Sequence, residues 1–364
     1  MELSLLMISA FLFLKLRSSI KGFRKLPRVK EENGSRDYRI SVIIPARNEE
    51  RRIGKCLESA LANLGEEDEL ILVNDCSSDS TELEALSKLD ERCKLITLLQ
   101  KPEAWTGKSW ACFQGYLHSS GDVLIFLDAD TRILSKLGSL IKLLEDFDAL
   151  SQVPRIKCDT LACGALEVAL TSLVRLSFPY WNLSPSKAWL MGAFMAWRRT
   201  SYERAGTHAV VSSSLVEDAE LARIALRKGL RISFFLGSIA ESSWVESWWE
   251  AHWTFRRICL AANLSGFVSV TAAILLSYAA IMIYICPIAA IMGFLNPSIA
   301  CIYLASVISY ASLSLKEVRT NPLSLALAPL AVILIASALL SSLKRSAVIW
   351  KGREYSAGTT EKSP

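Results

Sequence analysis

Two aspartates at the end of an apolar run have the side chains and the spacing of a metal-binding pair. Asp128 and Asp130 follow the run Val123 to Leu127 in the stretch GDVLIFLDADTRIL and are separated by one small residue. Carboxylates this close repel each other in a low dielectric unless a cation or strong hydrogen-bond donors compensate. Mg²⁺ or Mn²⁺ suits such a pair, because these ions take one or two carboxylates plus substrate phosphate oxygens. The alternative is a solvated turn in which Asp130 caps a following helix.

A second acidic pair stands in the stretch SLVEDAELARIALRKG. Glu217 and Asp218 precede apolar residues at helical spacing, namely Leu221, Ile224, Ala225 and Leu226. Acidic side chains at the start of a helix are favourable for electrostatic reasons alone. A carboxylate there can also act as a general base. On the residues alone, both interpretations stay open.

The elements that would position these carboxylates alternate along the chain. Short apolar runs predict strands at residues 39–45, 68–75, 94–99 and 122–130, and helical spacing predicts helices at 49–64, 80–89 and 109–119. This alternation predicts an α/β domain with a mostly parallel sheet, whose ligands lie beyond the carboxyl ends of the strands. Three of these strands end in the polar signatures PARNE, NDCSSDS and DADT.

Another part of the chain is apolar enough for a membrane. Hydrophobic residues make up 51% of the sequence and its mean hydropathy is +0.30, which is high for an ordinary globular protein. The stretch from Cys259 to Leu315 contains no Asp, Glu, Lys or Arg, and neither does the stretch from Thr320 to Leu343. One span needs about 20 apolar residues. We therefore expect at least two spans in the first stretch, divided near Leu295 to Ser298, and one in the second.

The N-terminal apolar stretch is shorter, from Leu3 to Leu14, and it is followed by positive charge. The basic residues are Lys15, Arg17, Lys21, Arg24, Lys25, Arg28 and Lys30. This asymmetry predicts an uncleaved anchor whose N-terminus lies outside, with the next domain in the cytoplasm.

Composition excludes two other classes of site. With nine cysteines and three histidines, and no second pair at zinc spacing beside Cys158 and Cys163, a structural zinc framework is not expected. Scattered thiols fit a reducing cytoplasm. The net charge of +5 is modest and the basic residues cluster beside membrane segments, which favours contact with lipid headgroups over nucleic acid.

Several motifs together resemble a known family. SVIIPARNEERRIGKCLESAL, ILVNDCSSDST, GKSWACFQG, FLDADT, GAFMAWRR and VEDAEL occur in the order and rough spacing of glycosyltransferase family 2. With its flanking apolar segments, the chain looks most like the membrane-bound branch that contains ceramide glucosyltransferase and the hopene- and carotenoid-associated glycosyltransferases. The resemblance implies a GT-A nucleotide-sugar-binding domain, an α/β fold, together with helical transmembrane segments. A glycosidase, which also uses two carboxylates, needs neither a nucleotide loop nor a metal pair.

The resemblance also implies residue roles. The loop that embraces the nucleotide would be Pro45, Ala46, Arg47, Asn48 and Glu49, with Asp75 and Asp79 contacting base and ribose. Asn74 stands where the family often has another aspartate. Lys108, which follows a glycine at the start of a helix, would meet the diphosphate. Asp128 and Asp130 match the metal-binding pair, with Asp128 also touching the donor, and Asp218 matches the general base.

Further positions are implied near the sugar and the acceptor. Gly192, Ala193 and Phe194 resemble the strand and loop beside the donor sugar, although the same stretch also reads as a plain buried strand. Glu217 and Trp253 would lie in the same vicinity. Arg256 matches the arginine of a diphosphate-binding motif whose glutamine and final tryptophan this chain lacks.

The aromatic cluster at residues 243–258 is typical of an interfacial helix. Trp244, Trp248, Trp249 and Trp253 would share one broad face of it. After the last apolar stretch, IWKGREY (Ile349 to Tyr355) resembles a short basic-aromatic motif of the same branch, or else a juxtamembrane snorkelling segment. Three C-terminal spans would leave this tail outside, whereas Lys344, Arg345, Lys351 and Arg353 favour the cytoplasm.

These observations predict a metal-dependent, inverting glycosyltransferase of the cell membrane that uses a UDP- or GDP-sugar and a lipid acceptor. We expect a membrane anchor at 1–17, a GT-A domain at 37–242, an interfacial helix at 243–258, a transmembrane region at 259–343 and a basic tail at 344–364. The alternatives are a polyprenyl-phosphate sugar synthase and a non-catalytic nucleotide-sugar-binding membrane protein. A processive polysaccharide synthase would need the missing glutamine and tryptophan.

Overall fold

A computed structural model describes residues 1–29, 38–243, 248–261, 265–344, 348–351 and 353–355. Lys30, Asp37, Trp244 and Arg345, which entered the sequence predictions, lie outside these ranges. The chain divides into two compact units. The α/β unit comprises Leu26–Arg155, Tyr180–Ser243 and Ile349–Pro364, and the helical unit comprises Met1–Lys25, Ile156–Pro179 and Trp244–Val348.

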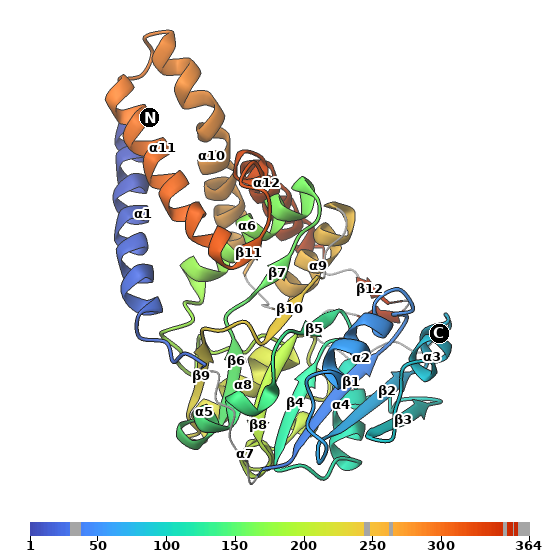
Figure 1. Cartoon of the computed structure of the whole chain (residues 1–364). Helices are drawn as coiled ribbons and strands as arrows, with labels where there is room; N and C mark the ends of the chain where they lie inside the picture. Colours follow the sequence, from blue (N-terminus) through green and yellow to red (C-terminus); the bar gives the residue numbers. More distant parts are fainter. Residues whose placement is uncertain (30–37, 244–247, 262–264, 345–347, 352, 356–364) are drawn as a thin grey trace. The chain divides into compact units, whose positions relative to one another are not determined.

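A seven-stranded sheet forms the centre of the α/β unit (Figure 1), in the order β3-β2-β1-β4-β8-β6-β9. Its strands are β1 (Ile40–Ala46), β2 (Glu69–Asp75), β3 (Cys93–Leu98), β4 (Val123–Leu127), β6 (Ala149–Gln152), β8 (Phe194–Arg198) and β9 (Ile232–Phe235). Strand β8 runs antiparallel to both β4 and β6, and the other pairings are parallel. The mostly parallel α/β sheet expected from the sequence is confirmed.

Helices cover both faces of this sheet because successive strand residues point to opposite sides. On β1, Val42 and Ile44 pack in a core with α2 residues such as Leu57, whereas Ile43 packs in a second core with Ala111 of α4. The helices of this unit are α2 (Ile53–Leu61), α3 (Thr81–Leu86), α4 (Gly107–Leu117), α5 (Ile141–Asp146), α7 (Arg199–Ala205) and α8 (Glu217–Arg227), with short 3-10 turns at Leu137–Leu140 and His208–Val211.

A short strand, not a helix, follows the aspartate pair. β5 (Thr131–Ile133) begins directly after Asp130 and pairs antiparallel with β10 (Ala240–Ser242). The alternative in which Asp130 caps a helix is therefore wrong. The backbone amide of Ser243 donates to the Asp130 carbonyl oxygen at 3.3 Å, which fixes the chain as it leaves the sheet.

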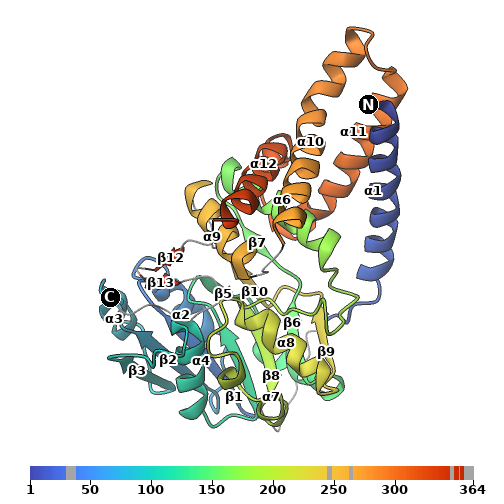
Figure 2. The same cartoon turned by 180° about the vertical axis from the view of Figure 1, so that it is seen from behind.

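The helical unit contains long apolar helices that run side by side (Figure 2). α1 (Glu2–Phe23) packs against α11 (Pro297–Ser312), which packs against α10 (Gly266–Ile291). These three and α12 (Ser324–Ser342) are long and apolar enough to cross a membrane. The Asn296 side chain caps α11 and Pro297 occupies its first turn, so the predicted break near residues 295–298 is a helix start.

Two further helices of this unit pack with α12. They are α6 (Leu161–Ser177) and α9 (Trp248–Ala261), and a buried core joins Leu166, Phe255 and Ile335 from the three helices. Trp248 packs against this core, whereas Trp249 and Trp253 are exposed. The single face expected for the tryptophans is therefore divided, because α6 covers part of α9.

Short elements complete the helical unit. β7 (Ile156–Lys157) pairs parallel with β11 (Val318–Arg319), which follows a 3-10 turn at Leu313–Lys316. A disulfide joins Cys158 and Cys163, so these two cysteines are not the free thiols expected from the sequence. The last described elements, β12 (Val348–Trp350) and β13 (Arg353–Tyr355), form a two-stranded ribbon whose residues from Ile349 onward belong to the α/β unit.

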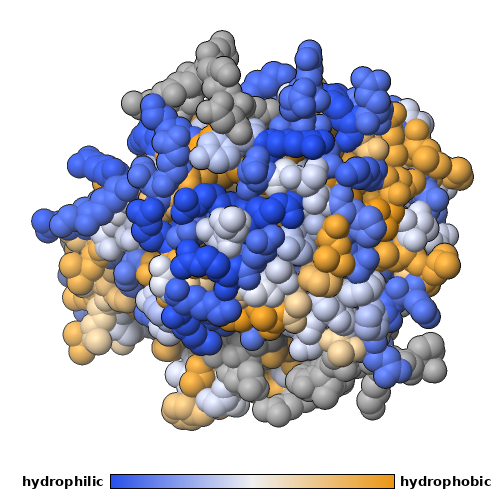
Figure 3. All heavy atoms as spheres, turned by 90° about the horizontal axis from the view of Figure 1, so that it is seen from below, coloured by the Kyte–Doolittle hydropathy of each residue, from blue (hydrophilic) through white to orange (hydrophobic). Residues whose placement is uncertain are grey.

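Figure 3 shows one face of the molecule on which hydrophilic side chains predominate and apolar side chains form separate patches. The helices of the helical unit are different, because large apolar side chains such as Phe267, Ile288 and Ile302 are exposed on them. Exposed apolar side chains on long apolar helices are typical of a lipid-facing surface.

Candidate active site

A buried lysine joins the two acidic pairs singled out in the sequence. Lys108 Nζ lies 2.8 Å from Asp128 Oδ1 and 3.0 Å from Glu217 Oε1. Burial alone would lower the pKa of Lys108, but Asp128, Glu217 and Asp218 together raise it well above its ordinary value. Lys108 therefore remains a cation. We call Lys108, Asp128, Gly192, Glu217 and Asp218 the transfer half of the site.

The surroundings of Asp218 orient its carboxylate and shift its pKa. It stands in the first turn of α8, and its Oδ2 accepts from the Gly192 amide at 3.0 Å while Oδ1 accepts from the Ala219 amide at 2.7 Å. Burial and the neighbouring Glu217 raise its pKa to about 6, against the opposing effect of Lys108. At neutral pH the group is ionised, yet it is more basic than an ordinary aspartate.

The segment before β8 forms the backbone wall of this half. A Cβ atom added to Gly192 would lie 2.8 Å from Asp218 Oδ2 and 3.1 Å from Lys108 Nζ, so only glycine fits here without displacing the site. The Ala193 carbonyl accepts from the Asp128 amide at 3.2 Å, and Phe194 pairs with Leu127 across β8 and β4. The three residues predicted near the sugar therefore lie beside Asp128 and Asp218.

Asp130 is the second carboxylate of the predicted metal pair. Burial, Asp128 and Glu49 raise its pKa to about 7, with Lys351 and Arg52 opposing. Such a carboxylate gains from a cation that replaces its proton. Within the described ranges, no group of three or more His, Cys, Asp or Glu residues could hold a metal ion. Two carboxylates suit a Mg²⁺ or Mn²⁺ ion that also binds phosphate oxygens of a substrate.

The loop after β1 is bound to the loop after β2 by polar contacts. The Arg47 guanidinium donates to the carbonyl oxygens of Asp75 at 2.7 Å and Cys76 at 2.8 Å. The Asn48 amide donates to Ser77 Oγ at 3.1 Å, and the Glu49 amide donates to Thr81 Oγ1 at 2.7 Å. Pro45 and Ala46 end β1 directly before this loop. Parallel neighbours end at the same edge, so the sheet itself brings these loops together.

The two aspartates predicted near the base and ribose differ in their partners. Asp79 accepts from the Glu50 amide at 3.2 Å and from the Thr81 amide at 3.0 Å, which closes the loop before α3. Asp75 is buried at the end of β2. The Asn74 amide group donates to Glu82 Oε2 at 2.5 Å.

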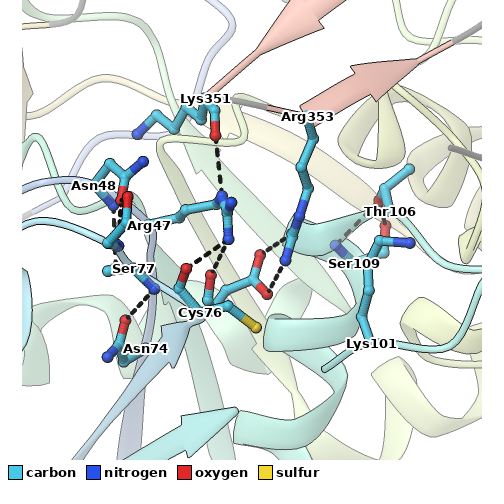
Figure 4. Close-up of polar contacts among 12 residues, drawn as sticks. Arg47, Asn48, Asn74, Cys76, Ser77, Lys101, Thr106, Ser109, Lys351 and Arg353 are labelled. Atoms are coloured by element: carbon cyan, nitrogen blue, oxygen red, sulfur yellow. Dashed lines mark hydrogen bonds and ion pairs between the residues drawn. The ribbon is translucent and has the colours of Figure 1, made fainter. Parts of the chain in front are cut away.

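Two cations near the end of the chain also belong to this region. Arg353 Nη2 donates to Asp75 Oδ1 at 3.0 Å, and its Nη1 contacts the other oxygen. Lys351 Nζ contacts Glu49, and the Lys351 carbonyl oxygen accepts from Arg47 Nε at 3.0 Å. Figure 4 shows that Lys351 and Arg353 lie over Arg47 and Cys76. We call Arg47, Glu49, Asp75, Lys351 and Arg353 the nucleotide half of the site.

Comparison with known families identifies this part of the chain. Residues 41–205 match the profile of "Glycosyl transferase family 2". The matched segment is identified as a family 2 glycosyltransferase domain, most of which lies in the α/β unit. The matched range includes β1 to β8, the loop after β1 and both aspartates of the pair, and Asp218 follows it on α8.

Curated relatives match part of this domain. Residues of the chain are 38% identical over 104 residues to a 4,4'-diaponeurosporenoate glycosyltransferase of Staphylococcus haemolyticus (strain JCSC1435), a match that covers 29% of this chain and 27% of the relative. The protein of the same name from Staphylococcus aureus (strain MRSA252) is 38% identical over 98 residues, covering 27% and 25%. The match thus spans about a quarter of the length of these relatives.

A solved structure resembles nearly the whole chain. The mannosyltransferase PcManGT from Pyrobaculum calidifontis, in complex with GDP-Man and Mn²⁺, aligns with a TM-score of 0.55 and 18% identity over 94% of this chain and 96% of that chain. At this identity the likeness shows the fold alone. The family 2 domain therefore has the GT-A type α/β fold that the sequence predicted.

Two predicted site residues do not belong to the same unit as the rest. Arg256 and Trp253 lie on α9 in the helical unit. The Arg256 guanidinium stacks over the Trp253 ring at 5.3 Å, and it donates to the carbonyl oxygens of Ser341 and Lys344 at 3.4 and 3.2 Å. Their roles toward the diphosphate and the acceptor stay predictions.

Sequence reasoning missed Lys351 and Arg353 as parts of the site. Their motif was noticed, but it was placed with the membrane-proximal tail. The signal that could have found them is the spacing of two cations in a stretch with strand character, directly after a span. Gly107 was also missed: a Cβ atom there would lie 2.3 Å from Asp75 Oδ2 and in conflict with Arg353.

Proposed function

We propose that this protein is a membrane-bound, inverting glycosyltransferase that transfers a sugar from a UDP- or GDP-sugar to a lipid acceptor. The observation that carries the proposal is the position of Asp218, a carboxylate with a pKa of about 6 held beside Lys108 and the aspartate pair. A general base near the anomeric carbon, opposite a leaving diphosphate, is what a single inverting displacement requires.

The donor would lie along the carboxyl ends of β1, β2 and β4. The nucleoside would contact the loop after β1 and the end of β2, and the diphosphate would extend toward Asp128 and Asp130. A divalent ion bound there would neutralise charge on the leaving diphosphate. Asp128 and Asp130 are the residues that would hold it. The Mn²⁺ in the PcManGT complex and the fit of the carboxylate pair support a divalent ion, either Mg²⁺ or Mn²⁺.

Asp218 would accept the proton of an acceptor hydroxyl. Its Oδ atoms are oriented by the Gly192 and Ala219 amides, so the carboxylate does not need to reorganise when the acceptor arrives. The charge of Lys108 opposes the rise in the pKa of Asp218, so that Asp218 is ionised at neutral pH and able to accept a proton.

A lipid acceptor is supported by two observations. The helical unit carries four candidate membrane spans, and the curated relatives bear the name 4,4'-diaponeurosporenoate glycosyltransferase. We further propose that the α/β unit faces the cytoplasm at the cell membrane, because basic residues follow the first apolar helix. The second candidate is a polyprenyl-phosphate sugar synthase, in which the acceptor is already an anion.

The substitution Asp218→Asn tests the proposal and separates the two candidates. It keeps the shape of the side chain but removes its basicity, so transfer to a lipid hydroxyl should fall about 10²–10⁴-fold while nucleotide affinity is retained. Transfer is measured with labelled UDP-glucose and GDP-mannose on the detergent-solubilised full chain. Glu220→Gln, an exposed acid in the same turn of α8, is the matched control.

Two results would contradict the general-base role. An Asp218→Asn protein that transfers to a lipid hydroxyl at the rate of the Glu220→Gln protein would remove Asp218 from the reaction. A small loss confined to polyprenyl phosphate as acceptor would favour the second candidate.

A further inference from the structure

The nucleotide half contains two cations that are distant in sequence from their partners. Lys351 contacts Glu49 across 302 residues, and Arg353 pairs with Asp75 across 278 residues. We propose that Lys351 and Arg353 are donor-binding residues that hold the nucleoside diphosphate, so that the end of the chain forms one wall of the nucleotide site. This inference rests on the proposed function, because it assumes a nucleotide-sugar donor.

The two cations lie where ligands commonly bind in this type of fold. They lie over the loops that follow β1 and β2, at the edge of a parallel sheet where ligands bind in open α/β folds. Gly107, the first residue of α4, packs against the Asp75–Arg353 pair so closely that a Cβ atom would overlap both side chains. The pair therefore sits directly at the N-terminus of an eleven-residue helix, whose amides favour an anion.

Charge balance gives a second argument. The site is rich in carboxylates: Glu49, Asp75, Asp79, Asp128, Asp130, Glu217 and Asp218. Lys108 forms ion pairs with two acids of the transfer half, and Lys351 and Arg353 each form one with an acid of the nucleotide half. A diphosphate that approached these loops would meet net repulsion without further cations. Lys351 and Arg353, together with Arg47, supply positive charge where the nucleotide would lie, and arginine suits phosphate geometry in particular.

The backbone of this region is held in an uncommon conformation. Four described residues other than glycine have a positive φ: Thr207, at 61°, lies elsewhere, whereas Asn48, Cys76 and Lys351, at 52°, 52° and 48°, belong to this region. Left-handed backbone is costly for such residues and clusters at ligand sites. The three residues of this region belong to the segments joined by Arg47, which contacts Cys76 and Lys351 directly.

Lys351 also links the nucleotide half with the predicted metal pair. The Lys351 ammonium group contacts Glu49 in the loop after β1, and β1 pairs in parallel with β4, the strand that ends directly before Asp128. A diphosphate has to bridge the nucleoside and the metal. Lys351 therefore lies where it would contact the phosphates. Arg353, which is paired with Asp75, lies where it would contact the nucleoside end of the diphosphate.

Nucleotide binding by variants of the full chain tests the inference. Isothermal titration calorimetry in detergent, with UDP and with GDP, each with and without Mn²⁺, gives the affinities. Loss of one charge-assisted hydrogen bond should weaken binding about 10- to 100-fold for Arg353→Ala and for Lys351→Ala. Glu354→Gln, an exposed residue on β13, is the control and should bind like the unmodified protein.

Arg353→Ala leaves the buried Asp75 without this cation and so could disturb folding. Arg353→Lys keeps a positive charge but loses the planar fork, and it should give an intermediate loss at an unchanged unfolding temperature. Unchanged affinity in the folded variants would mean that the cations only anchor the tail. Tighter binding would mean that they block the site. Either result overturns the inference but leaves the donor site intact, whereas an unmodified protein that binds neither UDP nor GDP would remove the proposed function as well.

Discussion

The transfer half and the nucleotide half compensate their buried acids in different ways. In the transfer half, Lys108 lies at 2.8 and 3.0 Å from two carboxylates of the same α/β unit, Asp128 directly after β4 and Glu217 at the start of α8. In the nucleotide half, Glu49 and Asp75 receive their cations from Lys351 and Arg353, which the chain reaches only after the whole helical unit. The first arrangement is complete between Lys108 and Asp218 in the α/β unit, whereas the second depends on a segment that follows the helical unit.

This difference shows that the residues of the two halves are held in place in different ways. Residues on β4, α4 and α8 are fixed by buried cores on the sheet faces. Lys351 and Arg353 are fixed by their polar contacts with the loops of the nucleotide half. We therefore expect single substitutions in the transfer half to change the rate of sugar transfer. Substitutions in the nucleotide half should mainly change the affinity for the nucleotide.

The largest effect is expected for Lys108→Met, which removes the cation of the transfer half. Asp128, Glu217 and Asp218 would then repel one another, and transfer should fall about 10²–10³-fold. Because Lys108 lowers the pKa of Asp218 from a still higher value, its loss should move the acid limb of the pH–rate profile upward from about pH 6. A loss of rate with an unmoved acid limb would show that Lys108 does not act on the base.

A smaller effect is expected for Asp130→Asn, at the junction of the two halves. The apparent affinity for Mn²⁺ should fall about 10- to 100-fold. In the unmodified protein the metal competes with a proton on Asp130, whose pKa is about 7, so Mn²⁺ affinity should decrease as the pH is lowered through 7. The asparagine variant should lose this pH dependence. Full activity in excess chelator would contradict a metal at this pair.

The smallest effect is expected for Gly107→Ala, which crowds the nucleotide half without changing a charge. The added methyl group must displace Asp75 or Arg353, so UDP or GDP affinity should fall about tenfold or less with little change in the turnover of bound donor. Gly54→Ala is the matched control, because the new methyl there meets only the flexible end of Glu84. A reduced turnover at unchanged affinity would show that Gly107 acts through Lys108 instead.

Local patterns were sufficient to predict the first half of the sheet. Four expected strands correspond to β1, β2, β3 and β4, because each is a short apolar run with a polar end. The helix expected at 49–64 is shorter, from Ile53 to Leu61, since the preceding residues form the loop that Arg47 and Asn48 tie to β2. Hydrogen bonds across the loop outweigh helical spacing there.

Long-range pairing could not be predicted in the same way. The antiparallel placement of β8 between β4 and β6, and the pairing of β5 with β10, depend on segments that are far apart in the sequence. Asp218 was found because its acidic pair opens a helix with clear periodicity. Arg353 was not assigned to the site because nothing near it in the chain indicates Asp75 as its partner.

The position of β13 in the α/β unit limits how many of the candidate spans can cross a membrane. The chain leaves the α/β unit after Ser243 and rejoins it at Ile349, so on the membrane-bound function proposed above it crosses an even number of times in between. Three candidate spans, α10, α11 and α12, lie in that stretch, and they cannot all cross. β11 pairs with β7, which begins one residue after Arg155 of the α/β unit. On the proposed membrane-bound function, we therefore expect α10 and α11 to cross outward and back, and α12 to enter and leave by the same leaflet.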